Sequence, residues 1–375
     1  MSRLPRRLFE QRLAALQSML IARGHGAAIV DQTETLYFYT GFDLSEIVYR
    51  GLVVPAAGAP VLLVRRTDVG AFQDHSVIAD CRGYLDWEDG IAALAGILRE
   101  TTPDDASIAV DLHSYVMTPR RLAQLGAAIG NRAIVDVGSW FSDRRMVKAP
   151  EEIALLRAAA GIADRILPVF AAALRPGETV RAATAAASAE AVRAGADHGR
   201  IGLVALADGL DFFHKPPPAR PVVEGDAVHV ELTPRVGGYS GRLMRPVVVG
   251  APTAEQRERA AAVIALQDAQ IAAMTPGRKA SEVDAIVREG LVKAGLRPAV
   301  PNATGYTLGH YPVSTPRTSE HHRALSPVAD WPLEAGMAFH VVASTVGLAF
   351  SETVLVTADD PVRLTTTGRR IFSAG

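Results

Sequence analysis

Glutamate and histidine side chains share one face of a strand-like segment in the second half of the chain. Residues 227–233 alternate between apolar and polar types, so His229, Glu231 and Thr233 point to the same side. Histidine changes its charge near pH 6.5, and a glutamate accepts a proton or holds a cation. This face therefore suits proton transfer or the binding of a charged group.

A second strand-like segment presents another histidine. In Met337–Ala343 the alternation places His340 and Val342 on one side of the strand. The adjacent pair His321-His322 lies in a polar stretch and indicates a solvated loop. His340 is therefore the better candidate for a functional site.

The chain that carries these segments has 375 residues, which is more than one compact core usually holds. Because a long Ala- and Leu-rich helical stretch begins near Pro150, we expect two domains, residues 1–143 and 144–375.

The charge balance and the single cysteine limit the class of protein. Lys and Arg total 39 against 40 for Asp and Glu, a balance that argues against nucleic-acid binding and against a polybasic surface for lipid. No apolar run of about 18 residues is present to span a membrane. The single cysteine, Cys81, suits a reducing compartment, so we expect a cytoplasmic protein.

The first domain is expected to be mixed α/β, because helical periodicity alternates with short apolar runs. Its expected elements are a helix over Leu8–Arg23 that stops at Gly24, a hairpin of Gly51–Pro55 and Val61–Arg65, a helix over Gly90–Arg99 and a strand over Ser107–Asp111.

The second domain alternates long helices with strands of even length, which predicts helices packed over a curved, mostly antiparallel sheet. The expected helices are Glu151–Arg175, Val180–Ala194, Thr253–Met274 and Ser281–Ala294, and the expected strands are Ala227–Thr233, Arg245–Val249, Met337–Ala343 and Phe350–Thr357.

Several short motifs follow one another in a fixed order along this second domain. They are the segments 145–157 (RMVKAPEEIALLR), 174–178 (LRPGE), 225–226 (GD), 238–239 (GY), 333–337 (LEAGM) and 352–357 (ETVLVT). Together they resemble the pita-bread family of creatinase, prolidase, aminopeptidase P and methionine aminopeptidase. Residues 8–143 resemble the N-terminal domain of the creatinase and aminopeptidase P branch. The resemblance implies an α/β (α+β) chain in which a creatinase-like domain precedes a pita-bread domain.

The metallopeptidases of this family bind two divalent ions through two Asp, one His and two Glu. By the resemblance, these positions fall on Glu231, Arg242, Tyr306, Val342 and Ser351. Hard cations need several anionic oxygens, whereas arginine keeps its proton and accepts no metal. We therefore predict neither a metal nor another cofactor. A shift of one residue, with Glu352 as the last ligand, would restore only one more acid.

The resemblance also points to His214, seventeen residues before Glu231. That spacing is similar to the family's substrate-binding or catalytic histidine, which in creatinase transfers protons without a metal. We predict that His214 is the catalytic general acid/base. The alternative is an exposed loop histidine that precedes a proline-rich stretch.

The predicted substrate-binding residues are Glu231, Arg242, Tyr306, His310 and His340. For Glu231 and Arg242 two interpretations stay open. They form an ion pair that fills the metal positions, or Arg242 holds a substrate carboxylate while Glu231 binds an amino or guanidino group. Creatinase has a glutamate where Met244 stands here, so the substrate need not be creatine.

The leading hypothesis is a metal-independent, creatinase-like enzyme that hydrolyses a C–N bond in a small polar nitrogen compound. The same histidine could serve a lyase or isomerase, and a pseudoenzyme that binds a ligand or a protein is a further alternative. A metal-dependent Xaa-Pro peptidase is disfavoured because four of the five ligands are replaced. We expect a small-molecule substrate, no nucleic-acid or membrane partner, and a homodimer, because the creatinase branch completes its site across subunits.

Overall fold

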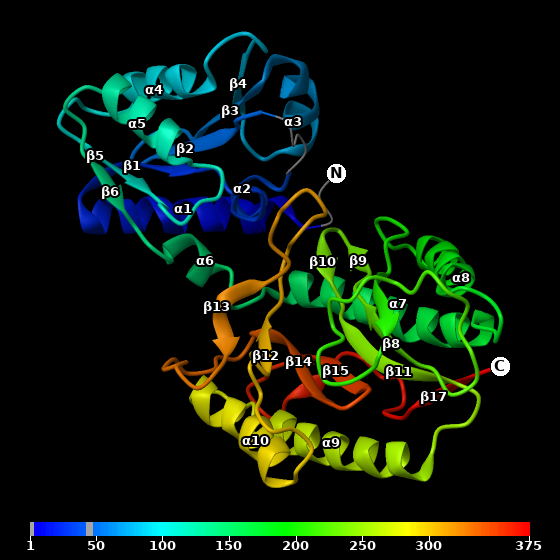
Figure 1. The fold of residues 1–375 in the computed structure, drawn as a ribbon. Coiled ribbons are helices and arrows are strands. Elements are labelled where there is room, and N and C mark those ends of the chain that lie inside the picture. The colour runs from blue at the N-terminus through cyan, green and yellow to red at the C-terminus, as the bar shows by residue number, and fades with distance from the viewer. Residues whose placement is uncertain (1–3, 43–47) are drawn as a thin grey trace. The chain divides into compact units, whose positions relative to one another are not determined.

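The structure, a computed structural model, describes residues 4–42 and 48–375 and divides the chain into two compact units. The first unit comprises Met1–Arg145 and His310–Pro316, and the second comprises Met146–Gly309 and Arg317–Gly375. The elements of each unit can be followed in Figure 1. The segment His310–Pro316 therefore belongs to the first unit although it lies far along the sequence.

The first unit is a mixed sheet with helices around it. Its strands follow the order β4-β3-β2-β1-β5-β6, in which β2 runs antiparallel to its two neighbours and the other pairs are parallel. The helices are α1 (Arg6–Arg23), α2 (Thr33–Thr40), α3 (Val69–His75), α4 (Gly90–Thr101), α5 (Pro119–Ala128) and α6 (Trp140–Arg144), with a 3₁₀ turn over Arg66–Asp68. The strands are β1 (His25–Val30), β2 (Gly51–Pro55), β3 (Val61–Arg65), β4 (Asp80–Tyr84), β5 (Ser107–Val110) and β6 (Ile134–Asp136).

The structure contains the helix end and the hairpin that the sequence of this unit predicts. Helix α1 ends at Gly24, whose φ of 72° is the left-handed conformation that glycine adopts without strain. The β2–β3 hairpin pairs Gly51 with Leu63 and Val53 with Val61. Both predictions are confirmed.

The second unit is a curled sheet whose strands follow the order β13-β12-β14-β15-β11-β8-β7, with antiparallel neighbours throughout. Its helices are α7 (Pro150–Ala173), α8 (Val180–Arg193), α9 (Ala254–Ala272) and α10 (Ala280–Lys293). Its strands are β7 (Gly202–Leu206), β8 (Ala227–Leu232), β9 (Arg235–Val236), β10 (Tyr239–Ser240), β11 (Leu243–Val249), β12 (Gly305–Thr307), β13 (Glu320–Leu325), β14 (Ala338–Thr345), β15 (Leu348–Leu355), β16 (Val362–Arg363) and β17 (Phe372–Ala374). The predicted fold class, helices over a curved antiparallel sheet, is confirmed.

The two faces of this sheet differ in character because side chains alternate along each strand. On one face, Ala343 and Phe350 pack with Val263 of α9 and Val287 of α10, and we call this the helix face. The opposite face, which we call the inner face, carries Val342 and its neighbours at the alternate positions. Helix α9 lies along the helix face of β14 and β15, and α10 packs against α9 and β13 (Figure 1).

Among the described residues, no helix combines the length and the apolar character that a membrane span requires.

Candidate functional site

Four positions of the inner face form a row across neighbouring strands. Glu231 of β8 pairs with Met244 of β11, Met244 pairs with Ser351 of β15, and Ser351 pairs with Val342 of β14. Residues paired in this way project to the same side of a sheet. The register therefore brings together residues that are up to 120 positions apart in the sequence.

Arg242 joins this face because it precedes Met244 by two residues. Its Nη1 donates a hydrogen bond to the Tyr306 hydroxyl at 2.5 Å and lies 3.4 Å from Oε1 of Glu231. Its Nη2 donates to the carbonyl oxygen of Thr318 at 3.3 Å. The Glu231–Arg242 ion pair is buried, since each side chain is less than a tenth exposed.

Tyr306 links the guanidinium to a histidine. Tyr306 of β12 pairs with His340 of β14, and its hydroxyl lies 2.8 Å from Nδ1 of His340. Because Arg242 donates to the hydroxyl oxygen, we assign the hydroxyl as the donor to Nδ1, which puts the imidazole proton on Nε2. We call Glu231, Arg242, Tyr306 and His340 the inner cluster. The structure thus brings together four of the residues that the sequence singled out.

Burial decides the protonation of this cluster. Loss of water lowers the pKa of His340 well below its usual range, and the nearby charge of Arg242 lowers it further. Burial also raises the pKa of Tyr306 to about 12, although Arg242 opposes that shift. At neutral pH the imidazole is therefore uncharged and the phenol keeps its proton.

The backbone of Arg242 is held by Thr353, which sequence reasoning did not single out. The Arg242 N–H donates to Oγ1 of Thr353 at 2.7 Å, and the same hydroxyl donates to the Arg242 carbonyl at 2.9 Å. Thr353 is fully buried on β15. No local sequence signal marks this contact, because the two residues are 111 positions apart.

The neighbour of Arg242 is a glycine for a steric reason. A Cβ on Gly241 would lie 2.2 Å from the backbone nitrogen of Ala160 in helix α7. Only glycine allows β10 and β11 to approach the helix so closely, and this approach sets the position of Arg242.

We expect Gly241→Ala to lower the free energy of unfolding by about 1–3 kcal/mol, since the added methyl must push helix α7 away. Denaturant unfolding followed by circular dichroism measures the change. Gly161→Ala, in helix α7 itself, is the matched control, because a Cβ added there would meet nothing within 4 Å. The control should be neutral or stabilising by up to about 1 kcal/mol. Equal effects of the two substitutions would contradict the steric argument.

The centre of the row is apolar. Phe212 is fully buried and packs with Met244 and Val342 in one hydrophobic cluster. Its ring and that of Phe213 also contact His229, with centroids 5.2 and 5.4 Å away. Burial lowers the pKa of His229 to about 3, so this histidine is neutral.

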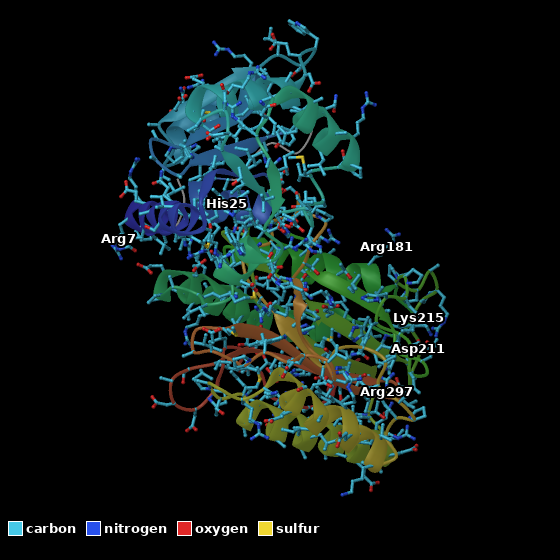
Figure 2. All side chains as sticks on the ribbon, turned by 90° about the vertical axis from the view of Figure 1, so that its left-hand side faces the viewer. Arg7, His25, Arg181, Asp211, Lys215 and Arg297 are labelled. Carbon is cyan, nitrogen blue, oxygen red and sulfur yellow. The ribbon has the colours of Figure 1, made fainter. Side chains whose placement is uncertain are left out.

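His214 lies in an exposed turn directly after Phe213. Within the described part of the chain it forms no hydrogen bond or ion pair. It influences the site electrostatically, because it adds to the effect of burial that lowers the pKa of His229. Figure 2 shows Asp211 and Lys215, which flank it in sequence, at the surface of the second unit. Its catalytic role stays a prediction.

His310 is placed in the first unit rather than with the inner cluster. It is buried there, and its ring stacks on Tyr37 with centroids 3.6 Å apart and planes within 3° of parallel. Its predicted role in substrate binding stays a prediction.

His321 contacts the inner cluster from the solvent side. It is an exposed residue of β13, and its ring centroid lies 5.1 Å from that of Tyr306. The polar stretch around it indicated a loop, which the structure corrects to a strand. The strand was missed because polar residues at the edge of a sheet have no apolar alternation.

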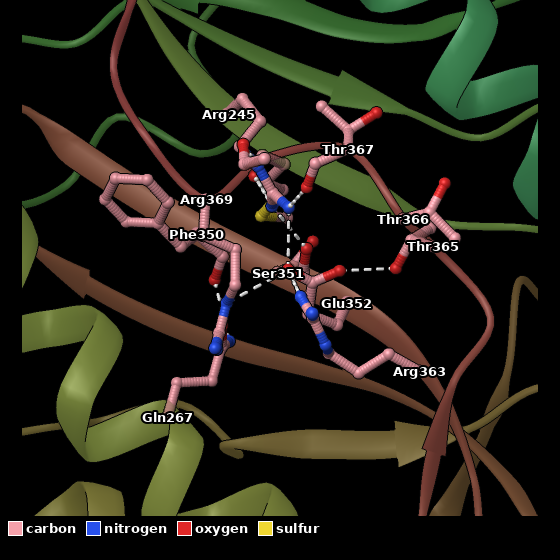
Figure 3. A network of polar contacts seen from close by, with 12 residues as sticks. Arg245, Gln267, Phe350, Ser351, Glu352, Arg363, Thr365, Thr366, Thr367 and Arg369 are labelled. Carbon is pink, nitrogen blue, oxygen red and sulfur yellow. Dashed lines mark hydrogen bonds and ion pairs between the residues drawn. The ribbon is translucent and has the colours of Figure 1, made fainter.

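Glu352 points to the helix face, away from the inner cluster. Its Oε1 accepts a hydrogen bond from Arg245 at 2.6 Å and lies 3.2 Å from Nε of Arg369, and its other oxygen accepts from Thr365 (Figure 3). Val341, which pairs with it, also faces this side. A one-residue shift that would make Glu352 a ligand beside Glu231 is therefore excluded by the register.

A curled antiparallel sheet with helices on one face and a buried polar cluster on the other defines a pita-bread class of fold, and the comparisons name the family. The model of metallopeptidase family M24 matches residues 154–358, and that of the creatinase/prolidase N-terminal domain matches residues 12–147. The chain belongs to metallopeptidase family M24.

Similar proteins are named as dipeptidases. An Xaa-Pro dipeptidase of Lactobacillus helveticus is 25% identical over 334 residues, covering 88% of each chain. A probable dipeptidase PepE of Mycobacterium tuberculosis is 29% identical and covers 69% of this chain and 68% of its own. The fold is also that of the solved prolidase from Thermococcus sibiricus, with a TM-score of 0.84 at 21% identity, covering 97% of this chain and 99% of that one.

These findings overturn the hypothesis of a metal-independent, creatinase-like enzyme for a small nitrogen compound. The relatives are named for peptidase activity, and their similarity extends over both domains rather than over one site. The hypothesis was wrong because it let replacements at a few positions decide the branch of the family. Similarity over the whole chain carries more weight for the class of substrate.

The family name implies metal ions, and the residues at the positions assigned above do not fit them. The row offers one carboxylate, Glu231, which is already paired with a guanidinium. Its other positions hold the side chains of Met244, Ser351 and Val342. Among the described residues there is no group of three or more His, Cys, Asp or Glu that could hold a metal. A guanidinium cannot act as a metal ligand. The Arg242 guanidinium, 3.4 Å from Oε1 of Glu231, would also repel a cation bound to that carboxylate.

Proposed function

We propose that the chain is a hydrolase of the amide C–N bond in short peptides, with dipeptides as the first substrate class to test. The observation that carries the proposal is the family match, which includes both domains and most of the chain. Relatives from several bacteria are named as dipeptidases. The inner cluster supports the proposal by offering hydrogen-bond donors and one carboxylate on the face where the resemblance puts the family's ligands.

A second candidate, the binding of short peptides without cleavage, is favoured by one observation. Arg242 stands in the set of positions that the resemblance assigns to metal ligands, and it binds Glu231 and Tyr306 instead. In this candidate the inner cluster recognises the peptide and the family's chemistry is lost. The substrate class is the same, so one experiment separates the two candidates.

The purified full chain is incubated with alanyl-proline, alanyl-leucine and a wider dipeptide panel, with and without added Mn²⁺, Co²⁺ or Zn²⁺. Mass spectrometry detects free amino acids, and calorimetry measures binding in parallel. We expect cleavage of at least one dipeptide, and binding without cleavage would support the second candidate. If the protein neither binds nor cleaves any dipeptide, both candidates are contradicted. Arg242→Gln, purified in the same way, controls for contaminating peptidases.

The same preparation tests a further expectation. The resemblance implies a homodimer, which sedimentation at micromolar concentration would detect. A stable monomer would contradict it.

A further inference from the structure

The charge around Arg242 is not balanced by the side chains of this unit. Arg235 and Arg242 are both buried, and burial lowers the pKa of Arg235 to about 10, with the nearby charge of Arg242 lowering it further. Within the described residues, Glu231 is the one carboxylate that pairs with Arg242, and Arg235 forms no ion pair. Two buried guanidiniums therefore share one buried carboxylate, because Asp197, whose charge also favours the charged form of Arg235, is exposed. This arrangement favours a further anion.

The fold brings the two arginines to one place. Strands β9 and β10 form a tight hairpin in which Arg235 pairs with Ser240, two residues before Arg242. Residues on one side of such a ladder, offset by two positions, are neighbours. The turn residue Gly238 donates its N–H to the exposed Asp197, as does Gly237, so that carboxylate is engaged by the backbone.

Several buried donors of the β9–β10 hairpin and of the inner cluster have no acceptor among the described residues. They are Nε of Arg235, Oγ of Ser240, Nε of Arg242 and Nε2 of His340. A buried donor without a partner costs about 1–3 kcal/mol. The three donors of Arg235, Ser240 and Arg242, which the β9–β10 pairing brings together, therefore favour a bound acceptor. A planar guanidinium presents its N–H groups in a fork that matches the two oxygens of a carboxylate.

We infer that Arg242, with Arg235 and Ser240 beside it, binds the C-terminal carboxylate of a short peptide. This inference rests on the proposed function for its substrate class and adds the group that is recognised. Tyr306 and His340 then hold the Arg242 side chain in place, since the Tyr306 hydroxyl accepts from Nη1 at 2.5 Å. Glu231 competes with the ligand for the same guanidinium, because it already lies 3.4 Å from Nη1.

The test compares alanyl-proline with its C-terminal amide, with binding measured by calorimetry on the full chain. The wild-type protein should bind the free acid at least tenfold more tightly than the amide. Arg242→Gln should weaken binding of the free acid by about 30-fold or more and change binding of the amide by less than about threefold. Arg200→Gln, an exposed arginine that influences Arg235 only electrostatically, is the control and should bind as the wild type does.

Glu231→Gln should change the affinity for the free acid in the opposite direction to Arg242→Gln. Removing the competing carboxylate should strengthen binding of the free acid by about 3–10-fold, whereas a purely structural role for Glu231 would weaken binding of both peptides. Equal affinity for acid and amide in the wild type would overturn the inference while leaving the peptide proposal standing. Absence of binding for both peptides, with every dipeptide of the panel also inert, would overturn the proposed function itself.

Discussion

Replacing Glu352 with glutamine is expected to lower the free energy of unfolding by about 3–5 kcal/mol, the usual effect of removing one partner from a buried ion pair. Glu352 and Arg245 are both fully buried, with Nη2 of Arg245 2.6 Å from Oε1 of Glu352. Burial alone lowers the pKa of Arg245, and the Glu352 carboxylate opposes that shift. The substitution leaves this guanidinium charged and without its counter-ion.

The damage should extend to the C-terminal segment. Glu352 also lies 3.2 Å from Nε of Arg369 and 3.6 Å from Nη1 of Arg363, and it accepts a hydrogen bond from Thr365. These contacts hold residues 363–369 on the helix face, as Figure 3 shows. Hydrogen exchange by mass spectrometry should therefore show faster exchange in this segment as well as in β15.

An exposed pair provides the matched control. Glu282 and Arg278 form an ion pair of similar length, 2.8 Å, but both side chains are about half exposed. Glu282→Gln should change the free energy of unfolding by less than about 0.5 kcal/mol. A similar small change for Glu352→Gln would show that water reaches the buried pair and would contradict the argument.

The sequence could predict the parts of the site that depend on local alternation. Residues 227–233 alternate, and the structure accordingly places Glu231 and His229 on the inner face of β8. The same alternation placed His340 on the side where it meets Tyr306. The family resemblance added Arg242, which no periodicity singles out.

The sequence could not predict contacts that depend on register between distant strands. Thr353 holds the backbone of Arg242, and Arg245 binds Glu352, across more than 100 residues in each case. Strand β12 has three residues, too few for a pattern to mark it. The balance of charge around Arg235 likewise depends on a two-residue pairing in the β9–β10 hairpin.

A second large effect is expected in the first unit, where Asp31 is buried at the end of β1. Burial raises the pKa of its carboxyl to about 7, and the nearby charge of Asp111 adds to this, while a hydrogen bond from Ser114 at 2.6 Å opposes it. In the unfolded chain an aspartate titrates near pH 4. Between about pH 4 and pH 7 the folded state therefore keeps a proton that the unfolded state has lost.

The sign of the pH dependence follows from this difference. Because the folded state binds more protons in that interval, the contribution of Asp31 to stability falls as the pH rises, and it stays low above pH 7. A difference of about three pKa units corresponds to about 4 kcal/mol. Asp31→Asn removes this dependence, since an amide resembles the protonated carboxyl and does not titrate.

We expect the stability of Asp31→Asn relative to the wild type to rise by about 4 kcal/mol from pH 4 to pH 8. Comparing the two pH values cancels any fixed cost of fitting the amide beside Ser114. Hydrogen exchange of β1 and β5, measured by mass spectrometry, reports on this unit alone. The exposed Asp105→Asn should show a change below about 0.5 kcal/mol over the same range. If the relative stability of Asp31→Asn does not change with pH, the Asp31 carboxyl is charged in the folded protein, and Arg50 and Arg121, which favour its charged form, outweigh burial.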